Sequence, residues 1–140
     1  MSVMSDQDFP VTIFHNPKCG TSRNVVAMVR AAGYEPRVIE YLQTGWTAQA
    51  LKDLLAEMGK RPADVLRSKG TPAEDLGLLK DAVSDDALLA AMIEHPILVE
   101  RPIVRTPKGT VLARPSEAVF DVLERRPESF TKEDGEVVRF

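Results

Sequence analysis

The chain has few cysteine, histidine and aromatic residues, and it has no long apolar run. Of its 140 residues, 1 is cysteine, 2 are histidine and 6% are aromatic. A single cysteine excludes an internal disulfide and a dithiol mechanism, and together with two well-separated histidines it makes no convincing metal-ligand cluster. No apolar segment approaches the length that crosses a membrane. One unpaired thiol is typical of a reducing cytoplasm.

Composition and charge indicate an ordinary globular protein. The chain is 44% hydrophobic and 28% charged, which is enough apolar material for a core. Its net charge of -3 argues against nucleic acid as a general partner. The first residues lack the charged and apolar regions of a signal peptide, so we expect a cytoplasmic protein. We find no repeat or internal linker, and we predict one domain over residues 1–140.

The only cysteine, Cys19, lies where an apolar run stops and a helical pattern begins. Residues 11–14 read as a buried strand, Asn16-Pro17 as a turn, and Val25 begins one face of the helix that follows. Because the neighbours of Cys19 are polar or small, a buried core position is disfavoured. We therefore predict a partly exposed, reactive thiol at the N-terminus of a helix.

The first residues of this helix favour a thiolate over a thiol. The backbone N–H groups of Gly20, Thr21 and Ser22 lack helical partners, and the positive end of the helix dipole adds to them. The same donors can hold an anion. Ser22 stands where a Cys-x-x-Cys pair would have its second cysteine, and its hydroxyl either donates to the thiolate or satisfies first-turn backbone. A second thiol must come from a small molecule, another protein or another copy of the chain.

The rest of the pattern alternates strands and helices. A second strand follows the first helix, and a right-handed crossover makes it parallel to the first strand. That second strand is predicted over 37–41. Two longer helices follow: one is capped by Thr47 and ended by Gly59, with Leu51, Leu54, Leu55 and Met58 inside, and the other is opened by Ser84, with Leu88, Leu89, Met92 and Ile93 inside. The remaining predicted elements are helical turns at 64–67 and 73–76, a hairpin of 101–105 and 110–114, a helix after Pro115 and a terminal helix from Thr131.

The hairpin carries two arginines that each precede a proline, Arg101 and Arg114. A residue before proline is pushed toward extended geometry, which restricts the directions in which its side chain projects. Ligands of α/β proteins gather where strand ends meet helix starts, the zone in which Cys19 also lies. Each arginine taken singly also fits a solvated surface charge.

Three blocks of the sequence, 15–24, 95–104 and 114–117, resemble the glutaredoxin-coupled arsenate reductases. The resemblance covers residues 11–124, and 130–135 extend it. It implies an α/β, thioredoxin-like fold: a mixed sheet flanked by helices, with an inserted helical region at about 47–95 and a C-terminal tail at about 126–140.

The resemblance also implies a reaction in which a cysteine thiolate attacks arsenate, glutathione joins the adduct, and glutaredoxin takes up the glutathione as arsenite forms. By position Cys19 is the nucleophile, and Arg67, Arg101 and Arg114 bind the oxyanion. No cofactor is bound, and glutathione is a cosubstrate. The resemblance gives His15 a part in holding the thiolate, although a histidine bonded to backbone at a strand end fits equally. It also suggests a cis bond between Arg101 and Pro102.

Two alternatives stay open. A monothiol glutathione-dependent disulfide oxidoreductase or transferase would need Cys19 but not three arginines. A redox-responsive transcription regulator of the same fold would bind RNA polymerase, although such regulators often carry the Cys-x-x-Cys pair that Ser22 replaces. The tyrosine-phosphatase-like arsenate reductases need an arginine six residues after the cysteine, and residue 25 is valine.

Overall fold

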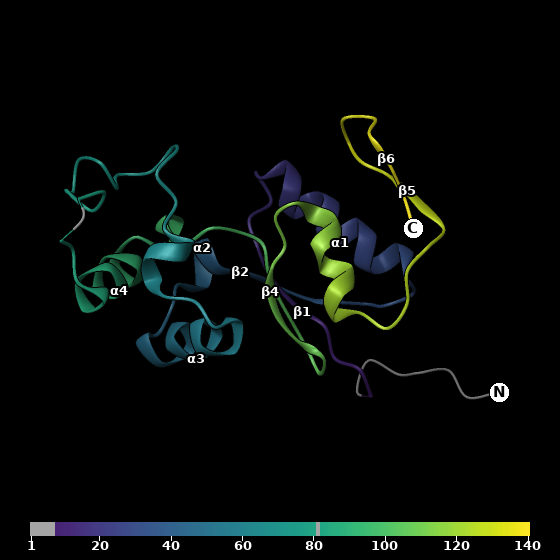
Figure 1. Cartoon of the computed structure of the whole chain (residues 1–140), viewed down its shortest axis with the longest axis horizontal. Helices are drawn as coiled ribbons and strands as arrows, with labels where there is room; N and C mark the ends of the chain where they lie inside the picture. The colour runs from purple at the N-terminus through teal and green to yellow at the C-terminus, as the bar shows by residue number, and fades with distance from the viewer. Residues whose placement is uncertain (1–7, 81) are drawn as a thin grey trace. The chain divides into compact units, whose positions relative to one another are not determined.

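The computed structural model describes residues 8–80 and 82–140, and the chain forms two compact units. The first unit contains residues 8–40 and 101–140, and the second contains residues 41–100. In Figure 1 the first unit therefore carries both ends of the colour scale and the second unit its middle. Among the described residues, no helix is both long and apolar enough to cross a membrane.

A four-stranded mixed sheet forms the centre of the first unit. Its order is β2-β1-β3-β4, with β1 parallel to β2 and antiparallel to β3. Ile13 of β1 pairs with Val38 on one side and Val104 on the other. The predicted parallel strand and the predicted hairpin are confirmed, although the strands are shorter than expected. Their bounds are β1 Thr12–His15, β2 Arg37–Glu40, β3 Ile103–Thr106 and β4 Gly109–Leu112.

Two helical segments pack together with this sheet, α1 (Gly20–Ala31) and the 3-10 helix η3 (Ser116–Val122). The first was predicted from the helical spacing of its apolar residues, and that spacing directs Val25, Met28 and Val29 into the core. The helix expected after Pro115 is present in the tighter 3-10 form. A hydrophobic core cluster of this unit comprises Phe9, Val11, Ile13, Val25, Met28, Val29, Ala32, Tyr34, Val104, Ala113, Val119, Phe120, Val122 and Leu123.

The predicted terminal helix from Thr131 is wrong. Residues 129–139 form an antiparallel hairpin of β5 (Ser129–Thr131) and β6 (Val137–Arg139). Its turn contains Gly135 at φ +92°, a left-handed conformation that glycine adopts without steric cost and that stops a helix. The β-branched pair Val137-Val138 then favours a strand. Short-range turn chemistry therefore outweighs the helical pattern at this end of the chain.

The second unit is helical, and its caps agree with the sequence. The Thr47 side chain accepts a bond from Ala50 N, Ser84 accepts from Ala87 N, and Gly59 ends its helix in the left-handed conformation. Met58 and Ile93, expected inside, are half-buried. The elements are α2 Tyr41–Thr44, α3 Ala48–Met58, η1 Pro62–Val65, α4 Asp85–Glu94 and η2 Pro96–Leu98. Tyr41 therefore belongs to α2, and the strand expected over 37–41 ends one residue earlier.

The helical turn expected over 64–67 ends at Val65, and the chain then becomes extended. Leu66 and Val99 form an isolated antiparallel bridge. On either side of it, Arg67 N donates to Leu98 O at 2.7 Å and Glu100 N donates to Val65 O at 2.8 Å. The turn expected at 73–76 is present, with Leu76 N bonded to Pro72 O at 2.9 Å. The bridge places the segment of Arg67 beside the segment that leads to Glu100.

Candidate active site

Cys19 caps the N-terminus of α1 at the end of a tight loop. Its backbone is extended (φ -98°, ψ 122°), and its carbonyl accepts the first helical bond from Arg23 N at 3.0 Å. Before it, Lys18 N donates to the Asn16 side chain at 2.9 Å and Cys19 N donates to Asn16 O at 3.0 Å. Because Asn16 is buried and holds this turn, the sulfur is presented from a defined loop while Cys19 itself stays half-buried.

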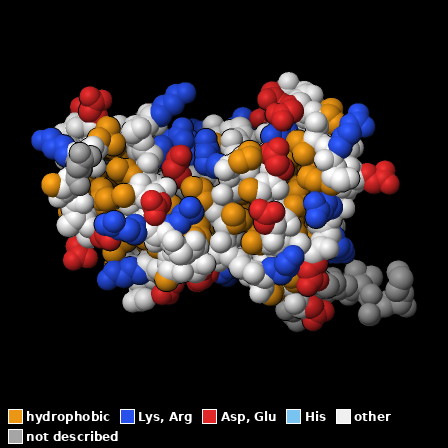
Figure 2. Space-filling view, in the orientation of Figure 1, with side chains coloured by type: hydrophobic (Ala, Val, Ile, Leu, Met, Phe, Trp, Pro, Cys, Tyr) orange, Lys and Arg blue, Asp and Glu red, His pale blue; other side chains and the backbone are white. Residues whose placement is uncertain are grey.

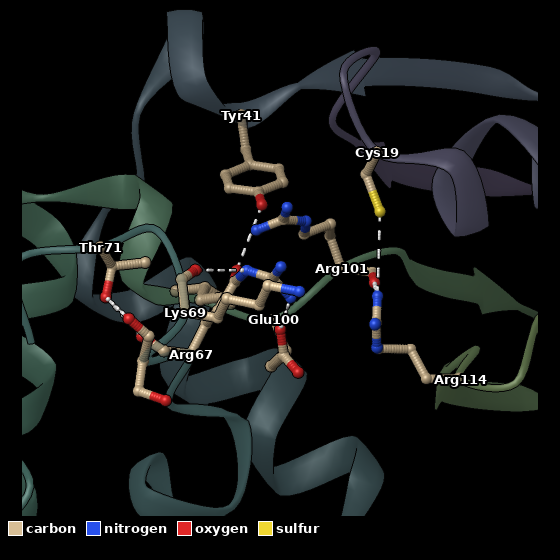
Figure 3. Close-up of polar contacts among 10 residues, drawn as sticks. Cys19, Tyr41, Arg67, Lys69, Thr71, Glu100, Arg101 and Arg114 are labelled. Atoms are coloured by element: carbon tan, nitrogen blue, oxygen red, sulfur yellow. Dashed lines mark hydrogen bonds and ion pairs between the residues drawn. The ribbon is translucent and has the colours of Figure 1, made fainter.

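Two of the predicted arginines lie at the sulfur. Arg114 Nη1 is 3.8 Å from Cys19 Sγ, and the same nitrogen donates to Arg101 O at 2.9 Å (Figure 3). The guanidinium of Arg101 also favours the charged form of Cys19 and so lowers the pKa of this thiol. Both residues lie just outside the strands of the hairpin, and both precede a cis proline. The cis bond expected at Arg101–Pro102 is confirmed, and the one at Arg114–Pro115 was not anticipated.

Arg101 has spare hydrogen-bonding capacity in a buried position. The residue is 9% exposed, and its Nε and Nη1 have no hydrogen-bond partner among residues 8–80 and 82–140. A buried charged donor left without an acceptor is costly, so such groups mark places where a ligand or ion completes the bonding. The donors belong to a planar guanidinium beside a thiol, which suits a bound oxyanion.

The surroundings of Cys19 stabilise its charged form. Burial of the sulfur opposes ionisation, but the Ser22 backbone N–H and the guanidiniums of Arg101 and Arg114 outweigh it, so the pKa of Cys19 is lowered. Ser22 N–H is one of the helix N-terminal donors that the sequence predicted to favour the thiolate. The first two residues of α1, Gly20 and Thr21, are half-buried beside the cysteine.

The Ser22 hydroxyl bonds residues that precede Cys19 in the chain. Its Oγ accepts from Asn16 N at 3.1 Å and lies 2.7 Å from His15 Nδ1. Ser22 and His15 are both buried, so this bond ties the end of β1 to the first turn of α1. Burial, together with Arg23 and Arg30, outweighs Glu40 and lowers the pKa of His15, which favours the neutral imidazole at pH 7. His15 therefore bonds the Ser22 side chain rather than backbone, and a part of His15 in holding the thiolate stays a prediction.

Arg67, the third predicted arginine, lies in the second unit. Its Nη1 bonds Glu100 Oε1 at 2.7 Å, and its Nε donates to Lys69 O at 3.1 Å (Figure 3). Both side chains of the pair are largely buried, at 17% and 23% exposed. The first unit thus brings together Cys19, Arg101 and Arg114, and a role of Arg67 at the same site stays a prediction. Its carboxylate partner Glu100 was not anticipated from the sequence.

The positive charge at the cysteine is local. The whole chain has a net charge of -3, and Figure 2 shows acidic and basic side chains interspersed over the face in view. Against this mixed background, Arg114 contacts the sulfur of Cys19, and Arg101 and Arg114 both favour its charged form. A local cationic cluster favours a small anion over an extended polyanion such as nucleic acid.

Comparisons with known proteins agree with this geometry. The ArsC family model matches residues 14–122. The arsenate reductase ArsI2 of Synechocystis sp. is 52% identical over 129 residues, covering 91% of this chain and 92% of that protein. An arsenate reductase of Escherichia coli is 51% identical over the same shares of the two chains. Among solved structures, the arsenate reductase from Vibrio cholerae superposes with a TM-score of 0.78 at 40% identity, covering 82% of this chain and 98% of that one.

Fold and site together define a thioredoxin-like α/β protein whose single cysteine caps the first helix. The mixed sheet and the cis proline after Arg101 are the features that the resemblance suggested. The chain belongs to the ArsC family. This confirms the family and the fold that the sequence blocks implied.

Proposed function

We propose that this protein reduces arsenate to arsenite, with Cys19 as the nucleophile. The observation that carries the proposal is the buried, unpartnered donor set of Arg101 beside a cysteine whose pKa is lowered. Arsenate is a tetrahedral oxyanion, and planar guanidiniums hold such ions through paired, charge-assisted hydrogen bonds. Family membership and relatives named arsenate reductases at about half identity support the same substrate.

The proposed reaction follows the chemistry of the family. The Cys19 thiolate attacks arsenic, an S–As bond forms, and an arsenate oxygen leaves as water after protonation. Glutathione then displaces a second oxygen, again as water, and arsenic is still As(V). A glutaredoxin thiolate attacks the glutathione sulfur, the As–S electron pair passes to arsenic, and a mixed disulfide and As(III) result. Water then releases arsenite from Cys19. Two thiols are oxidised for each arsenic reduced, which balances the electrons.

In this proposal the arginines offset the charge of the bound ion while arsenic accepts electrons. Arg101 and Arg114 act at the sulfur, and Arg67 is the third member of the clamp. Glutathione is a cosubstrate, no cofactor is bound, and the unpaired cysteine suits a cytoplasmic location. A single thiol cannot complete the cycle, so a second thiol must come from outside the chain, and in this proposal glutathione and glutaredoxin supply it.

The test is arsenate-dependent NADPH oxidation with glutathione, glutaredoxin and glutathione reductase present. The native chain should turn over, and Cys19→Ser should not, because the serine hydroxyl is a far weaker nucleophile at neutral pH. Arg101→Ala and Arg67→Ala should lose oxyanion chemistry, while Arg37→Ala, an exposed arginine in β2, serves as the matched control.

A native chain that is inactive beside a working reductase would overturn the arsenate assignment. The alternative is then a monothiol disulfide oxidoreductase, for which the helix N-terminus at Cys19 suffices. That enzyme should reduce a glutathione mixed disulfide, and it should retain this activity in Arg67→Ala, Arg101→Ala and Arg114→Ala.

A further inference from the structure

Arg23 links the cysteine loop to the C-terminal hairpin. Its Nη1 donates to Pro17 O at 2.8 Å, inside the loop that presents Cys19. Its Nε and Nη2 donate to the two carboxylate oxygens of Glu133 at 2.8 and 3.0 Å. One planar guanidinium therefore bonds the loop through one nitrogen and the hairpin through a bidentate fork. The sequence assigned no function to Arg23.

The hairpin holds Glu133 in a defined position. Glu133 N donates to the Asn24 side chain at 3.0 Å, one residue after Arg23. The neighbouring Lys132 side chain is only 11% exposed and bonds both carboxylate oxygens of Glu117, at 3.0 and 3.3 Å. Phe130 packs against the core cluster of the first unit. The tail is thus attached to the start of α1, to η3 and to the core of the first unit.

We propose that Arg23 and Glu133 act as one unit that positions the loop of residues 16–19, and with it the sulfur of Cys19. Arg23 and Glu133 are positioning residues, since neither is argued to touch a reacting atom. The inference requires only that Cys19 is a reactive thiol, so it stands apart from the arsenate assignment.

Geometry, more than charge, gives the pair its importance. Both side chains are well exposed, at 44% and 47%, and exposed ion pairs are screened by water. The bond from Arg23 to Pro17 O instead fixes a carbonyl two residues before the sulfur. Without it the turn loosens, and the bond from Ser22 N–H to the thiolate loses its alignment. Glu133 contributes by holding the guanidinium in place.

The test uses the rate of alkylation of Cys19 by iodoacetamide as a function of pH. The chain has 1 cysteine, so the signal belongs to Cys19 alone. The charged groups acting on this sulfur are Arg101, Arg114 and Arg23, and the first two are left intact. Arg23→Ala should raise the midpoint of the pH profile by roughly half a pH unit, because a donor set that favours the thiolate is weakened.

A double-mutant cycle then separates a coupled unit from two independent residues. Glu133→Ala should raise the midpoint by less than Arg23→Ala, and should add nothing in the Arg23→Ala background. Glu136→Ala is the matched control, because Glu136 lies on the same hairpin and contacts only Lys132 among the ion pairs of the described residues, at 3.4 Å. It should leave the midpoint unchanged.

Two results would overturn the proposal. One is a lower melting temperature of Arg23→Ala with an unchanged alkylation midpoint, which describes a purely structural pair. The other is an equal effect of Glu133→Ala in both backgrounds. If Arg23→Ala does not fold, Arg23→Lys provides the same test, because an ammonium cannot reproduce the fork and the Pro17 bond together. An unchanged midpoint in Arg23→Lys would also refute the proposal.

Discussion

Arg114 Nη1 contacts the sulfur of Cys19 at 3.8 Å and donates to the carbonyl of Arg101 at 2.9 Å. One guanidinium thus touches the proposed nucleophile and holds the backbone of the residue that supplies the second guanidinium. Replacing Arg114 therefore weakens the stabilisation of the thiolate and the placement of Arg101 at the same time.

We predict that Arg114→Ala lowers kcat/KM for arsenate by about 100-fold, the size expected when a preorganised donor to a developing charge is removed. Arg114→Lys should recover little of this loss, because lysine presents a point charge where arginine presents a planar fork. The coupled NADPH assay measures both variants, with Arg37→Ala as the control. Near-native activity in Arg114→Ala would contradict a role in the oxyanion site.

We predict that Cys19 is alkylated at lower pH in the folded chain than in the unfolded chain. The fold lowers the pKa of Cys19 because Ser22 N–H, Arg101 and Arg114 together outweigh the effect of burial. The thiolate is the reactive form, so the alkylation rate should reach half its maximum at a lower pH in the folded chain than in the unfolded chain.

Iodoacetamide labelling in buffer and in concentrated urea compares the two states directly. Arg101→Ala should move the folded midpoint toward the unfolded one, since it removes one of the stabilising donors. Identical midpoints in buffer and in urea for the native chain would show that the fold does not activate this sulfur.

We predict that acidification destabilises the protein in a window set by His15. Burial, with Arg23 and Arg30, holds the pKa of His15 below 6.5 in the folded state. Between the folded pKa and 6.5 the unfolded chain binds more protons, so the free energy of unfolding falls as the pH drops below about 6.5. The imidazole contributes no such change well above that pH.

Urea unfolding at a series of pH values measures this dependence. His15→Gln should flatten the curve in the window below about pH 6.5. The pKa values of Glu117 and Glu133 lie below 4.5, so their effects on stability occur at lower pH and can be distinguished from the effect of His15. An unchanged slope in His15→Gln would mean that His15 titrates alike in both states.

Elements with strong local signals could be predicted from the sequence. Thr47, Ser84 and Gly59 cap or end helices because a cap depends on residues within one turn. The strand, loop and helix around Cys19 follow for the same reason. The tail was misread because its turn at Gly135 and its packing through Phe130 compete with a helical pattern that is weak by itself.

Contacts between distant segments could not be predicted in this way. The bonds of Arg23 to Glu133 and of Arg67 to Glu100 join residues far apart in the chain, and single charges carry no signal of their partners. The link from His15 to Ser22 was also missed, although both residues were singled out. The roles of His15 and Ser22 depend on which of their atoms face each other after folding.

By itself the sequence determined that one thiol begins a helix and that no second cysteine can resolve it, because both depend on residue identity and local spacing. The resemblance of its blocks pointed to the family, which the comparisons confirmed. Only the tertiary structure decided that Arg114 contacts both the sulfur and the carbonyl of Arg101, and that Arg101 keeps buried, unpartnered donors. Convergence of side chains arises from the pairing of β3 with β1 and β4, and that long-range pairing is what brings the hairpin to Cys19.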